Sequence, residues 1–382
     1  MSKTILDTIC KDGFSFAKLV DSFSELSALK QVPQNPAYHA EGDVYCHTEM
    51  VCEVVRQEFE QKNLKLETAE RSYQEWALLF LAAAFHDIGK KTCTRSENGN
   101  FVSPNHTAVG AKIFRAFAYR QAPRFGLTFS QRELVANAIR RHGLPVWFWK
   151  KRRPEVDLLR AAESVPLWFL YQLSYADVRG RRTENPKEFT EYVEWFAEYA
   201  KELGVWEHPY SFANPYTKAS FFMRDDLWQG TKLFDNTEFD VFLLSGLPLA
   251  GKDSWIEKNG GKIPMISLDQ IREEMGIPPA KDSGKIARIA LERAKGFLIK
   301  RQSFFWNATN IVQETRRKLI TLFSNYGARV HILYLEVPYQ ELLARNRTRA
   351  RHIPEDVLEE MIKKLEIPAP WEAYEVKYLT ED

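Results

Sequence analysis

Residues 241–254 read VFLLSGLPLAGKDS, a short apolar strand that runs into a glycine-rich turn and then into a helix. The spacing G-x-x-x-x-G-K in this setting is typical of a loop whose backbone amides cradle phosphates, with the lysine on the β- and γ-phosphates of a nucleotide. A glycine-rich turn that binds no nucleotide is the alternative. We expect ATP, or another nucleoside triphosphate, to bind through Gly246, Pro248, Ala250, Gly251, Lys252, Asp253 and Ser254.

Asp253 occupies the position after the lysine, where a Ser or Thr hydroxyl usually binds Mg²⁺. Ser254 comes one position later. Two alternatives stay open at this point: Ser254 takes the Mg²⁺ role, or the ion is held in another way.

Three further strand candidates follow this loop, and helical stretches separate them. Alternating strands and helices predict a parallel sheet with right-handed crossovers. The strand candidates are IPMIS (263–267), SFFWNAT (303–309) and RVHILYLEV (329–337), and the helical stretches are 285–300 and 313–325.

Two charged segments accompany these strands. In SLDQIR (267–272), Asp269 and Arg272 are spaced to share one helical face. Asp269 could accept the proton of an attacking hydroxyl while Arg272 holds the acceptor's phosphate, and the alternative is that Asp269 caps a helix. The segment RNRTRAR (345–351) is either a solvated charge run or a set of arginines that close over ATP.

The first half of the chain reads as helical. SYQE at 72–75 predicts a capping box, because the Ser72 hydroxyl and the Glu75 carboxylate can satisfy free amides at a helix start. The apolar run 76–85 follows it directly, and SQRE at 130–133 predicts a second capping box. We therefore expect an all-α domain over residues 1–215, a connector over 216–237 and an α/β domain over 238–382.

Histidines and aspartates recur near the expected helix ends of the first half. A lone histidine is usually a packed or surface residue, but an ordered series of this kind predicts a metal site. Imidazole and carboxylate together suit Mn, Fe, Co, Ni, Cu or Zn better than Mg alone. The predicted metal ligands are His47, His86, Asp87, His106, His142 and Asp177.

The segment WFWKKRR (147–153) directly follows the last of these histidines. Aromatic rings with interleaved cations suit a single-stranded nucleic-acid end, through base stacking and phosphate contacts. The interpretation that we favour is two core tryptophans followed by a solvated basic face, since aromatic rings are dominant packing residues.

Composition excludes several classes of protein. The formal net charge of +2 argues against a polybasic binder, although it allows a local basic channel. The four cysteines show no C-x-x-C spacing, which argues against a disulfide scaffold or a cysteine zinc site. The N-terminus is too polar for a secretory signal, and the longest apolar run is too short to cross a bilayer. A cytoplasmic location without a membrane partner is expected.

The local contexts FHDIGK (85–90), NHTAVG (105–110), RRHG (140–143) and YADVRGR (175–181) resemble the HD phosphohydrolase superfamily over roughly residues 30–185. The resemblance implies one metal held by His47, His86, Asp87 and Asp177, with Asp87 bridging to a second metal held by His106 and His142. Such ions activate water and neutralise phosphate oxygens. Lys90, placed on the same helical face as His86, is expected to contact a phosphate oxygen.

The second half resembles the polynucleotide-kinase branch of P-loop phosphotransferases over roughly residues 238–382. GLPLAGKDS, LDQIR, WNATN (306–310) and the arginine-rich segment carry this resemblance. It implies that Asp269 is the general base, that Arg272 is an acceptor-phosphate ligand, and that Arg345 and Arg347 stabilise the transition state.

The combination is similar to the bacterial HD-Pnk family of nucleic-acid end-healing enzymes. The resemblance implies ATP-dependent phosphorylation of 5′-hydroxyl ends and removal of 2′,3′-cyclic, 2′- or 3′-phosphate ends, on RNA or DNA, in functional association with a polynucleotide ligase. Two other hypotheses stay open. One is a small-molecule nucleotide phosphohydrolase fused to a nucleoside or metabolite kinase, and the other is a non-enzymatic ATP-sensing module.

Overall fold

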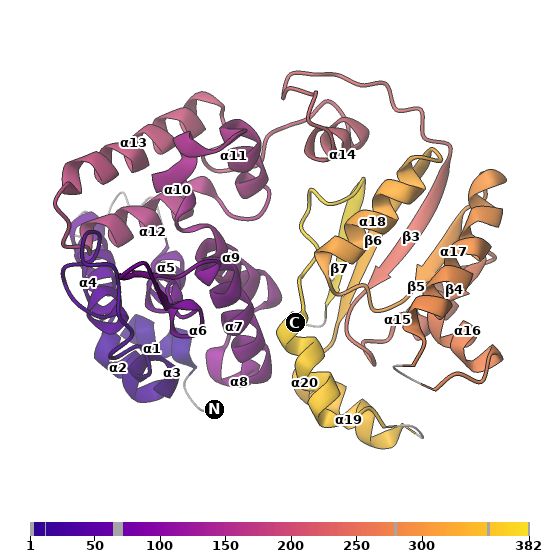
Figure 1. The fold of residues 1–382 in the computed structure, drawn as a ribbon, viewed down its shortest axis with the longest axis horizontal. Coiled ribbons are helices and arrows are strands. Elements are labelled where there is room, and N and C mark those ends of the chain that lie inside the picture. Colours follow the sequence, from indigo (N-terminus) through magenta and orange to yellow (C-terminus); the bar gives the residue numbers. More distant parts are fainter. Residues whose placement is uncertain (1–3, 12, 64–71, 279–280, 350–351, 381–382) are drawn as a thin grey trace. The chain divides into compact units, whose positions relative to one another are not determined.

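The computed structural model of the chain describes residues 4–11, 13–63, 72–278, 281–349 and 352–380 (Figure 1). It consists of two compact units, residues 1–210 and residues 211–382. The segment 216–237, expected as a connector, is part of the second unit, in which the Tyr374 hydroxyl donates a hydrogen bond to Asp235. No helix within the described ranges is long and apolar enough to span a membrane.

The N-terminal unit is helical, as the sequence predicts, apart from one short hairpin. Its helices are α1 (Ile5–Lys11), α2 (Phe16–Ser22), α3 (Ser24–Ser27), α4 (Val44–Asn63), α5 (Tyr73–Phe85), α6 (Lys90–Cys93), α7 (His106–Arg120), α8 (Ala122–Phe125), α9 (Phe129–Arg141), α10 (Leu144–Trp147), the 3₁₀ turn η2 (Phe148–Lys150), α11 (Pro154–Ala162), α12 (Leu167–Arg179) and α13 (Pro186–Glu202).

Helix α5 runs through the middle of this unit. The predicted capping box is confirmed at its start, where the Glu75 amide donates to the Ser72 hydroxyl at 3.2 Å and the Ser72 amide donates to the Glu75 carboxylate at 2.7 Å. Every residue from Trp76 to Phe85 is buried, so neighbouring helices cover this helix on all sides. Its C-terminal end delivers His86 and Asp87 to the interior of the unit.

The second predicted capping box is wrong. The box before α9 consists of Thr128 and Gln131, whose side chains accept hydrogen bonds from each other's backbone amides at 3.2 Å and 3.0 Å. Glu133, expected to serve as a cap, is buried and bonds to Arg115 and Arg132. Thr128 therefore starts the helix earlier, because the carboxylate of Glu133 is engaged inside the unit.

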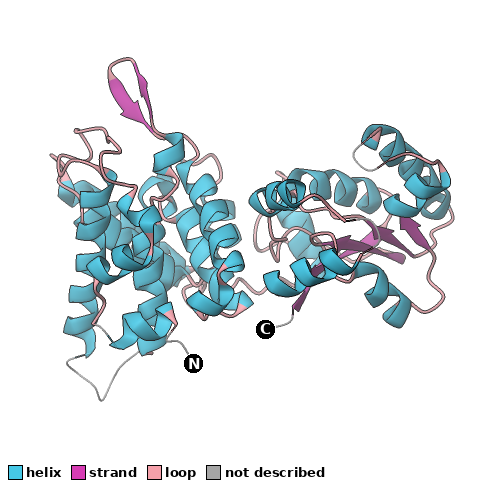
Figure 2. Ribbon diagram, turned by 90° about the horizontal axis from the view of Figure 1, so that it is seen from below, coloured by secondary structure: helices cyan, strands magenta, loops and turns pink. Residues whose placement is uncertain are grey.

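The hairpin of β1 (Arg95–Glu97) and β2 (Asn100–Val102) projects from the helices (Figure 2). Asn98 and Gly99 connect the strands with φ values of 51° and 79°. Two central residues with positive φ, in an Asn-Gly pair, are typical of the turn whose twist matches that of an antiparallel hairpin. The hairpin leads directly toward α7, which begins at His106.

The C-terminal unit contains a parallel five-stranded sheet in the order β4-β5-β3-β6-β7. The four predicted strands are confirmed, and β7 was not predicted. The elements are α14 (Pro215–Met223), β3 (Phe239–Ser245), α15 (Lys252–Asn259), β4 (Met265–Ser267), α16 (Leu268–Glu274), α17 (Ser283–Ile299), β5 (Phe304–Asn307), α18 (Gln313–Ser324), β6 (Ala328–Glu336), α19 (Tyr339–Thr348), α20 (Glu355–Lys364) and β7 (Glu375–Thr380).

Helices cover both faces of this sheet. Helices α17 and α18 pack on one face, where Ile286 and Phe323 join the side chains of Val241 and Ile332 in one core. Helix α15 packs on the other face through Ile256. The turn after β3 lies at the carboxyl end of the central strand, with β5 on one side and β6 on the other. In open parallel sheets ligands bind at this edge.

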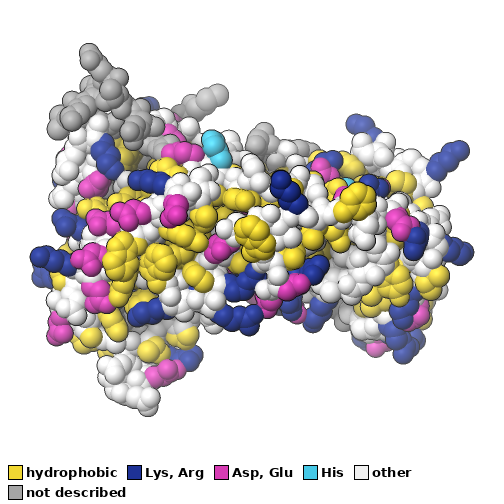
Figure 3. Space-filling model, turned by 90° about the horizontal axis from the view of Figure 1, so that it is seen from above, with side chains coloured by type: hydrophobic (Ala, Val, Ile, Leu, Met, Phe, Trp, Pro, Cys, Tyr) yellow, Lys and Arg dark blue, Asp and Glu magenta, His cyan; other side chains and the backbone are white. Residues whose placement is uncertain are grey.

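On the face drawn in Figure 3, Lys and Arg side chains are interspersed with Asp and Glu. This agrees with the formal net charge of +2 for the whole chain.

Candidate metal centre and phosphate-binding pocket

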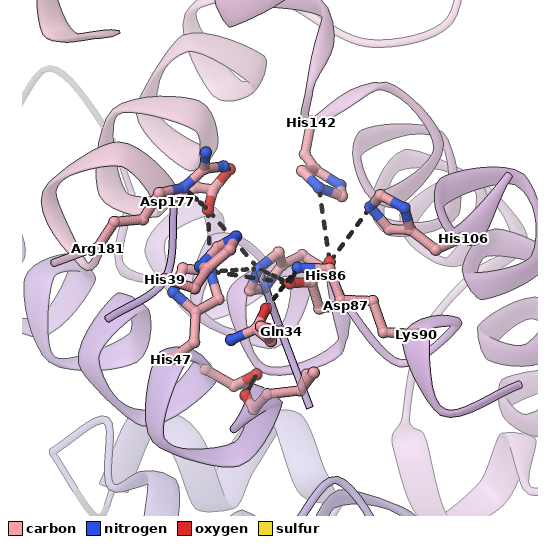
Figure 4. A network of polar contacts seen from close by, with 12 residues as sticks. Gln34, His39, His47, His86, Asp87, Lys90, His106, His142, Asp177 and Arg181 are labelled. Carbon is pink, nitrogen blue, oxygen red and sulfur yellow. Dashed lines mark hydrogen bonds and ion pairs between the residues drawn. The ribbon is translucent and has the colours of Figure 1, made fainter. Parts of the chain in front are cut away.

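Five elements of the N-terminal unit bring the predicted metal ligands together (Figure 4). Helix α4 carries His47, and α12 carries Asp177. The other four residues lie at helix ends. They are His86 and Asp87 after α5, His106 at the start of α7, and His142 after α9.

Three of the imidazole rings are held in one orientation by the same local contact. Each donates its Nδ1 hydrogen to the backbone carbonyl three residues earlier, and because a carbonyl only accepts, Nε2 keeps its lone pair. The pairs are His86 with Ala83 at 2.7 Å, His106 with Ser103 at 2.7 Å, and His142 with Ile139 at 2.9 Å. Contacts of this kind fix the tautomer and the ring orientation of metal-binding histidines.

The first group of ligand atoms comes from His47, His86, Asp87 and Asp177. Nε2 of His47 lies 3.3 Å from Nε2 of His86 and 3.0 Å from Oδ1 of Asp177. Nε2 of His86 lies 3.2 Å from Oδ2 of Asp87. The ligand atoms of His47, His86 and Asp87 lie within 4.8 Å of one another, and Oδ1 of Asp177 lies 3.9 Å from Nε2 of His86. Imidazole nitrogens together with carboxylates form a donor set that divalent transition metals prefer.

The second group consists of Asp87, His106 and His142. Oδ1 of Asp87 lies 3.4 Å from Nε2 of His106 and 3.8 Å from Nε2 of His142. Among the described residues, nothing donates a hydrogen bond to this buried oxygen. A buried carboxylate oxygen that faces two imidazole lone pairs is unfavourable without a cation, so the residues fit a second metal ion here.

The pKa shifts of three ligands suit metal binding, whereas at His47 burial lowers the pKa but Asp177 and Glu41 outweigh it and raise it, so that a metal replaces a proton on this ring. Burial lowers the pKa of His142 to about 3, which keeps this ring neutral. Burial raises the pKa of both carboxyl groups, but neighbouring cations outweigh it: Lys90 holds the pKa of Asp87 well below its ordinary value, and Arg181 does the same for Asp177. Metals bind neutral imidazole and ionised carboxylate.

Several residues around the ligands were not predicted. Oε1 of Glu41 lies 2.9 Å from Nδ1 of His47 and 2.8 Å from Nδ1 of His39, and the Arg182 amide donates to its other oxygen at 2.9 Å. Arg181 donates to both carboxylate oxygens of Asp177. Spacing along the chain could have revealed Arg181, which stands four residues after Asp177, but not Glu41, which a loop brings beside His47.

Lys90 lies beside the predicted metal ligands, but it does not share a helix with His86 as predicted. Helix α5 ends at Phe85, and Lys90 begins the separate helix α6. Its ammonium lies 2.7 Å from Oδ2 of Asp87 and donates to the side-chain oxygen of Gln34 at 2.7 Å.

The predicted phosphate-binding loop connects β3 and α15. Gly246 has a φ of 145°, and a Cβ there would lie 2.3 Å from the carbonyl oxygen of Leu335, so a larger residue does not fit. Leu249 and Gly251 also have positive φ, 67° and 88°. The ammonium of Lys252 donates to the carbonyls of Gly246 at 3.1 Å and Leu247 at 2.7 Å, and burial lowers its pKa to about 8.

A pocket of about 1980 Å³ opens beside this loop. Arg345 lines it and donates to the Leu249 carbonyl at 3.1 Å, whereas Arg347 is exposed and is not among the lining residues. Arg349, which was not singled out, does line the pocket. The other predicted residues in the lining are Pro248, Ala250, Gly251, Lys252, Asp253, Ser254, Asp269 and Arg272.

Asp269 is not the helix cap. Ser267 is the N-cap of α16, and its hydroxyl accepts from the Gln270 amide at 3.3 Å. The carboxylate of Asp269 is exposed toward the pocket. Arg272 donates to the carbonyls of Pro278 at 3.0 Å and Lys281 at 2.7 Å, so in this structure it holds the turn before α17.

Comparison with known families now assigns both units. An HD domain model matches residues 44–162, and an AAA domain model matches residues 241–368. The chain joins an HD domain to a P-loop kinase-type domain. The kinase-type domain is homologous to the L-seryl-tRNA(Sec) kinase of Methanococcus maripaludis, at 25% identity over 151 residues that cover 37% of this chain. The match spans 58% of that kinase's length.

Among solved structures, the kinase-type domain is similar to a sugar kinase from Janibacter sp. HTCC2649. The sequence identity is 17% and the TM-score 0.29, over 37% of this chain and 86% of the sugar kinase.

In the HD domain, the aromatic and basic segment after His142 is only partly buried. The prediction of two core tryptophans holds in part for Trp147, which is half-buried and packs against Phe189 at a ring distance of 6.0 Å. It is wrong for Trp149, which is 46% exposed, because Phe148 between them fills the core. Lys150 and Lys151 are exposed, as the solvated-face interpretation predicts.

Proposed function

We propose that this chain is a bifunctional nucleic-acid end-healing enzyme. The kinase-type domain transfers the γ-phosphate of ATP to a 5′-hydroxyl end. The HD domain removes 2′,3′-cyclic, 2′- or 3′-phosphates, and the substrates are broken RNA or DNA ends.

The observation that carries this proposal is that one chain joins an HD domain to a P-loop kinase-type domain, two types of domain with opposite phosphate chemistries. If a kinase and a phosphohydrolase act on the same group of one small molecule, the second removes the phosphate that the first adds. On a broken strand they are complementary, because a 5′-hydroxyl must gain a phosphate and a 3′ end must lose one before a ligase can seal the break. A polynucleotide ligase is therefore the expected consumer of the product.

Two further findings support a large acceptor. The pocket of about 1980 Å³ exceeds the roughly 300–1000 Å³ of ordinary small-molecule sites, which leaves room for a nucleotide together with an extended acceptor. The homologous kinase carries tRNA in the name of its substrate.

In the kinase-type domain, the proposed roles follow the positions around the pocket. Lys252 compensates phosphate charge in the loop, and Asp269 accepts the proton of the attacking hydroxyl. Arg345, next to Leu249, stabilises charge on the transferred phosphoryl group, and Arg349 is better placed than Arg347 to assist it. Arg272 reaches an acceptor phosphate only after it releases the Pro278 and Lys281 carbonyls.

In the HD domain, His106 marks the side from which substrate enters. Its side chain is 23% exposed, whereas that of His142 is 5% exposed and that of His86 is fully buried. A bound metal supplies a Lewis acid and an activated water. Lys90, whose ammonium lies beside Asp87, neutralises an oxygen of a phosphate that binds at the metal centre.

One pair of assays tests the proposal. Purified protein with divalent metal is incubated with ATP and a 5′-hydroxyl oligonucleotide, and separately with an oligonucleotide that ends in a 2′,3′-cyclic phosphate. We expect phosphorylation of the first and hydrolysis of the second. Activity confined to mononucleosides and mononucleotides would instead support the small-molecule hypothesis, and no turnover of either class would support an ATP-sensing module.

A further inference from the structure

Asp253 places a carboxylate inside the phosphate-binding loop. It is the second residue of α15, directly after Lys252, and it lines the pocket. The start of a helix favours anions, and a nucleotide brings its phosphates to this point. A fixed negative charge there repels the phosphates unless a cation lies between them.

Asn307 holds this carboxylate in position. The side-chain amide of Asn307, 5% exposed at the end of β5, donates to Oδ1 of Asp253 at 2.5 Å. Among the described residues nothing donates to Oδ2, and the side chain of Asp253 is exposed and lines the pocket. The arrangement therefore fixes one oxygen of Asp253 and leaves the other able to bind an ion.

A second carboxylate, that of Asp269, lines the same pocket as Asp253. Both carboxylates act electrostatically on Lys252, the buried cation of the loop, and oppose the lowering of its pKa by burial. The ammonium of Lys252 is drawn toward the carbonyls of Gly246 and Leu247. Mg²⁺ is a hard cation that is typically bound by one or two carboxylates together with substrate phosphates.

We propose that Asp253 is a direct ligand of the Mg²⁺ that accompanies the nucleotide, in the position where a P-loop normally offers a hydroxyl. Asn307 is the residue that positions it, and Ser254 is not the ligand. It follows that nucleotide binding depends on the cation more steeply than in a loop with Ser or Thr. This inference rests on the proposed kinase function.

The test measures binding of a fluorescent ATP analogue to the full chain, in Mg²⁺ and in EDTA. Asp253→Asn keeps the shape of the side chain and the acceptor for Asn307, and removes only the charge. In Mg²⁺ the variant should bind at least about tenfold more weakly than the parent, because a ligand to the ion is lost. In EDTA it should bind more tightly than the parent, because the repulsion is gone.

Glu257→Gln is the matched variant, because Glu257 is an exposed carboxylate on the same helix that does not line the pocket, and it should leave both affinities within about twofold of the parent. The metal centre of the HD domain is the same in every variant, so its contribution cancels in the comparison. The assignment is overturned if Asp253→Asn changes the nucleotide affinity in the same direction in Mg²⁺ and in EDTA, or changes it in neither. Loss of Mg²⁺-dependent binding in Ser254→Ala alone assigns the ion to the hydroxyl instead.

The failure of this inference is distinguishable from failure of the proposed function. If the parent binds the nucleotide but Asp253→Asn does not change the affinity as expected in Mg²⁺ and in EDTA, only the assignment of Asp253 fails and the kinase function stands. A parent protein that binds no adenine nucleotide with or without Mg²⁺ overturns the assignment and the kinase function together.

Discussion

Arg115 on α7 forms a two-pronged ion pair with Glu133 on α9, with Nε 3.0 Å from Oε1 and Nη2 2.8 Å from Oε2. Both side chains are buried. Helix α7 begins with His106 and α9 ends just before His142. The ion pair therefore connects the two helices whose histidines face Oδ1 of Asp87.

Glu133→Gln should destabilise the HD domain by about 3–5 kcal/mol at neutral pH, since it leaves buried arginines without their charge partner. Burial raises the pKa of Glu133, but Arg115 and Arg132 outweigh it and hold the pKa below the ordinary 4.5. The ion pair therefore contributes its full stabilisation when the pH is above the ordinary pKa of a glutamate. This stabilisation is lost as the pH falls through the lowered pKa of Glu133. The difference in Tm between parent and variant should accordingly shrink below about pH 4.5. Glu314→Gln, in an exposed pair with Arg317, is the control and should leave the Tm nearly unchanged at every pH, because solvent screens an exposed ion pair. Equal effects of both variants would show that the Arg115–Glu133 pair has no special role.

Asp87→Ala should remove the metal and with it all hydrolysis of 3′ phosphates, because this carboxylate contributes to both groups of ligand atoms. His86→Ala should do the same through the first group. Kinase activity should persist in both, since neither residue belongs to the phosphate-binding pocket. Metal content by elemental analysis and the two end-modification assays measure the outcome. Loss of both activities in a folded variant would contradict two independent sites.

Glu41→Gln should weaken metal binding about 10- to 100-fold while the fold is retained, as is typical when the partner of a metal-binding histidine is changed. The carboxylate beside Nδ1 of His47 raises the basicity of the ring, and an amide does not. Metal titration followed by calorimetry measures the change. Glu53→Gln on α4, the helix that carries His47, is the control; Glu53 pairs with Arg56 near the surface and its change should have no effect on affinity. If Glu41→Gln binds metal like the parent, Glu41 only supports the loop.

Lys252→Ala should abolish ATP-dependent phosphorylation of 5′ ends, because the lysine compensates phosphate charge in a buried loop. Hydrolysis of 3′ ends should be unchanged and should need no ATP. Lys262→Ala, at an exposed position after α15, is the matched control and should retain both activities. A requirement of ATP for hydrolysis would show that the two sites are coupled.

Asp269→Asn should lower kinase turnover by about 10²–10⁴-fold at nearly unchanged stability and ATP binding, as expected on loss of a general base. Ser267→Ala should behave in the opposite way, with a loss of about 0.5–2 kcal/mol of stability and nearly normal chemistry, because Ser267 is the cap. Thermal unfolding and steady-state kinetics on the two variants separate these effects. Turnover of Asp269→Asn within a few-fold of the parent would move the search for the base to another residue.

The sequence alone was sufficient for features that depend on neighbours along the chain. The phosphate-binding loop, the capping box of Ser72 and the strands β3 to β6 follow from local patterns, because a loop motif, a helix cap and the apolar run of a strand each involve residues a few positions apart. The order of histidines and aspartates also predicted which residues meet, since each stands in its own short motif.

Tertiary structure decided the features that join distant segments. Glu41 lies beside His47, Arg115 pairs with Glu133, and β7 forms only by adding to β6, because these contacts depend on packing rather than on spacing. Packing also selected Thr128 over Ser130 as the cap of α9, once the Glu133 carboxylate was used in the interior. Helix and loop geometry likewise placed Arg349, and not Arg347, in the pocket. Local patterns thus specified the chemical groups, and the fold specified their partners.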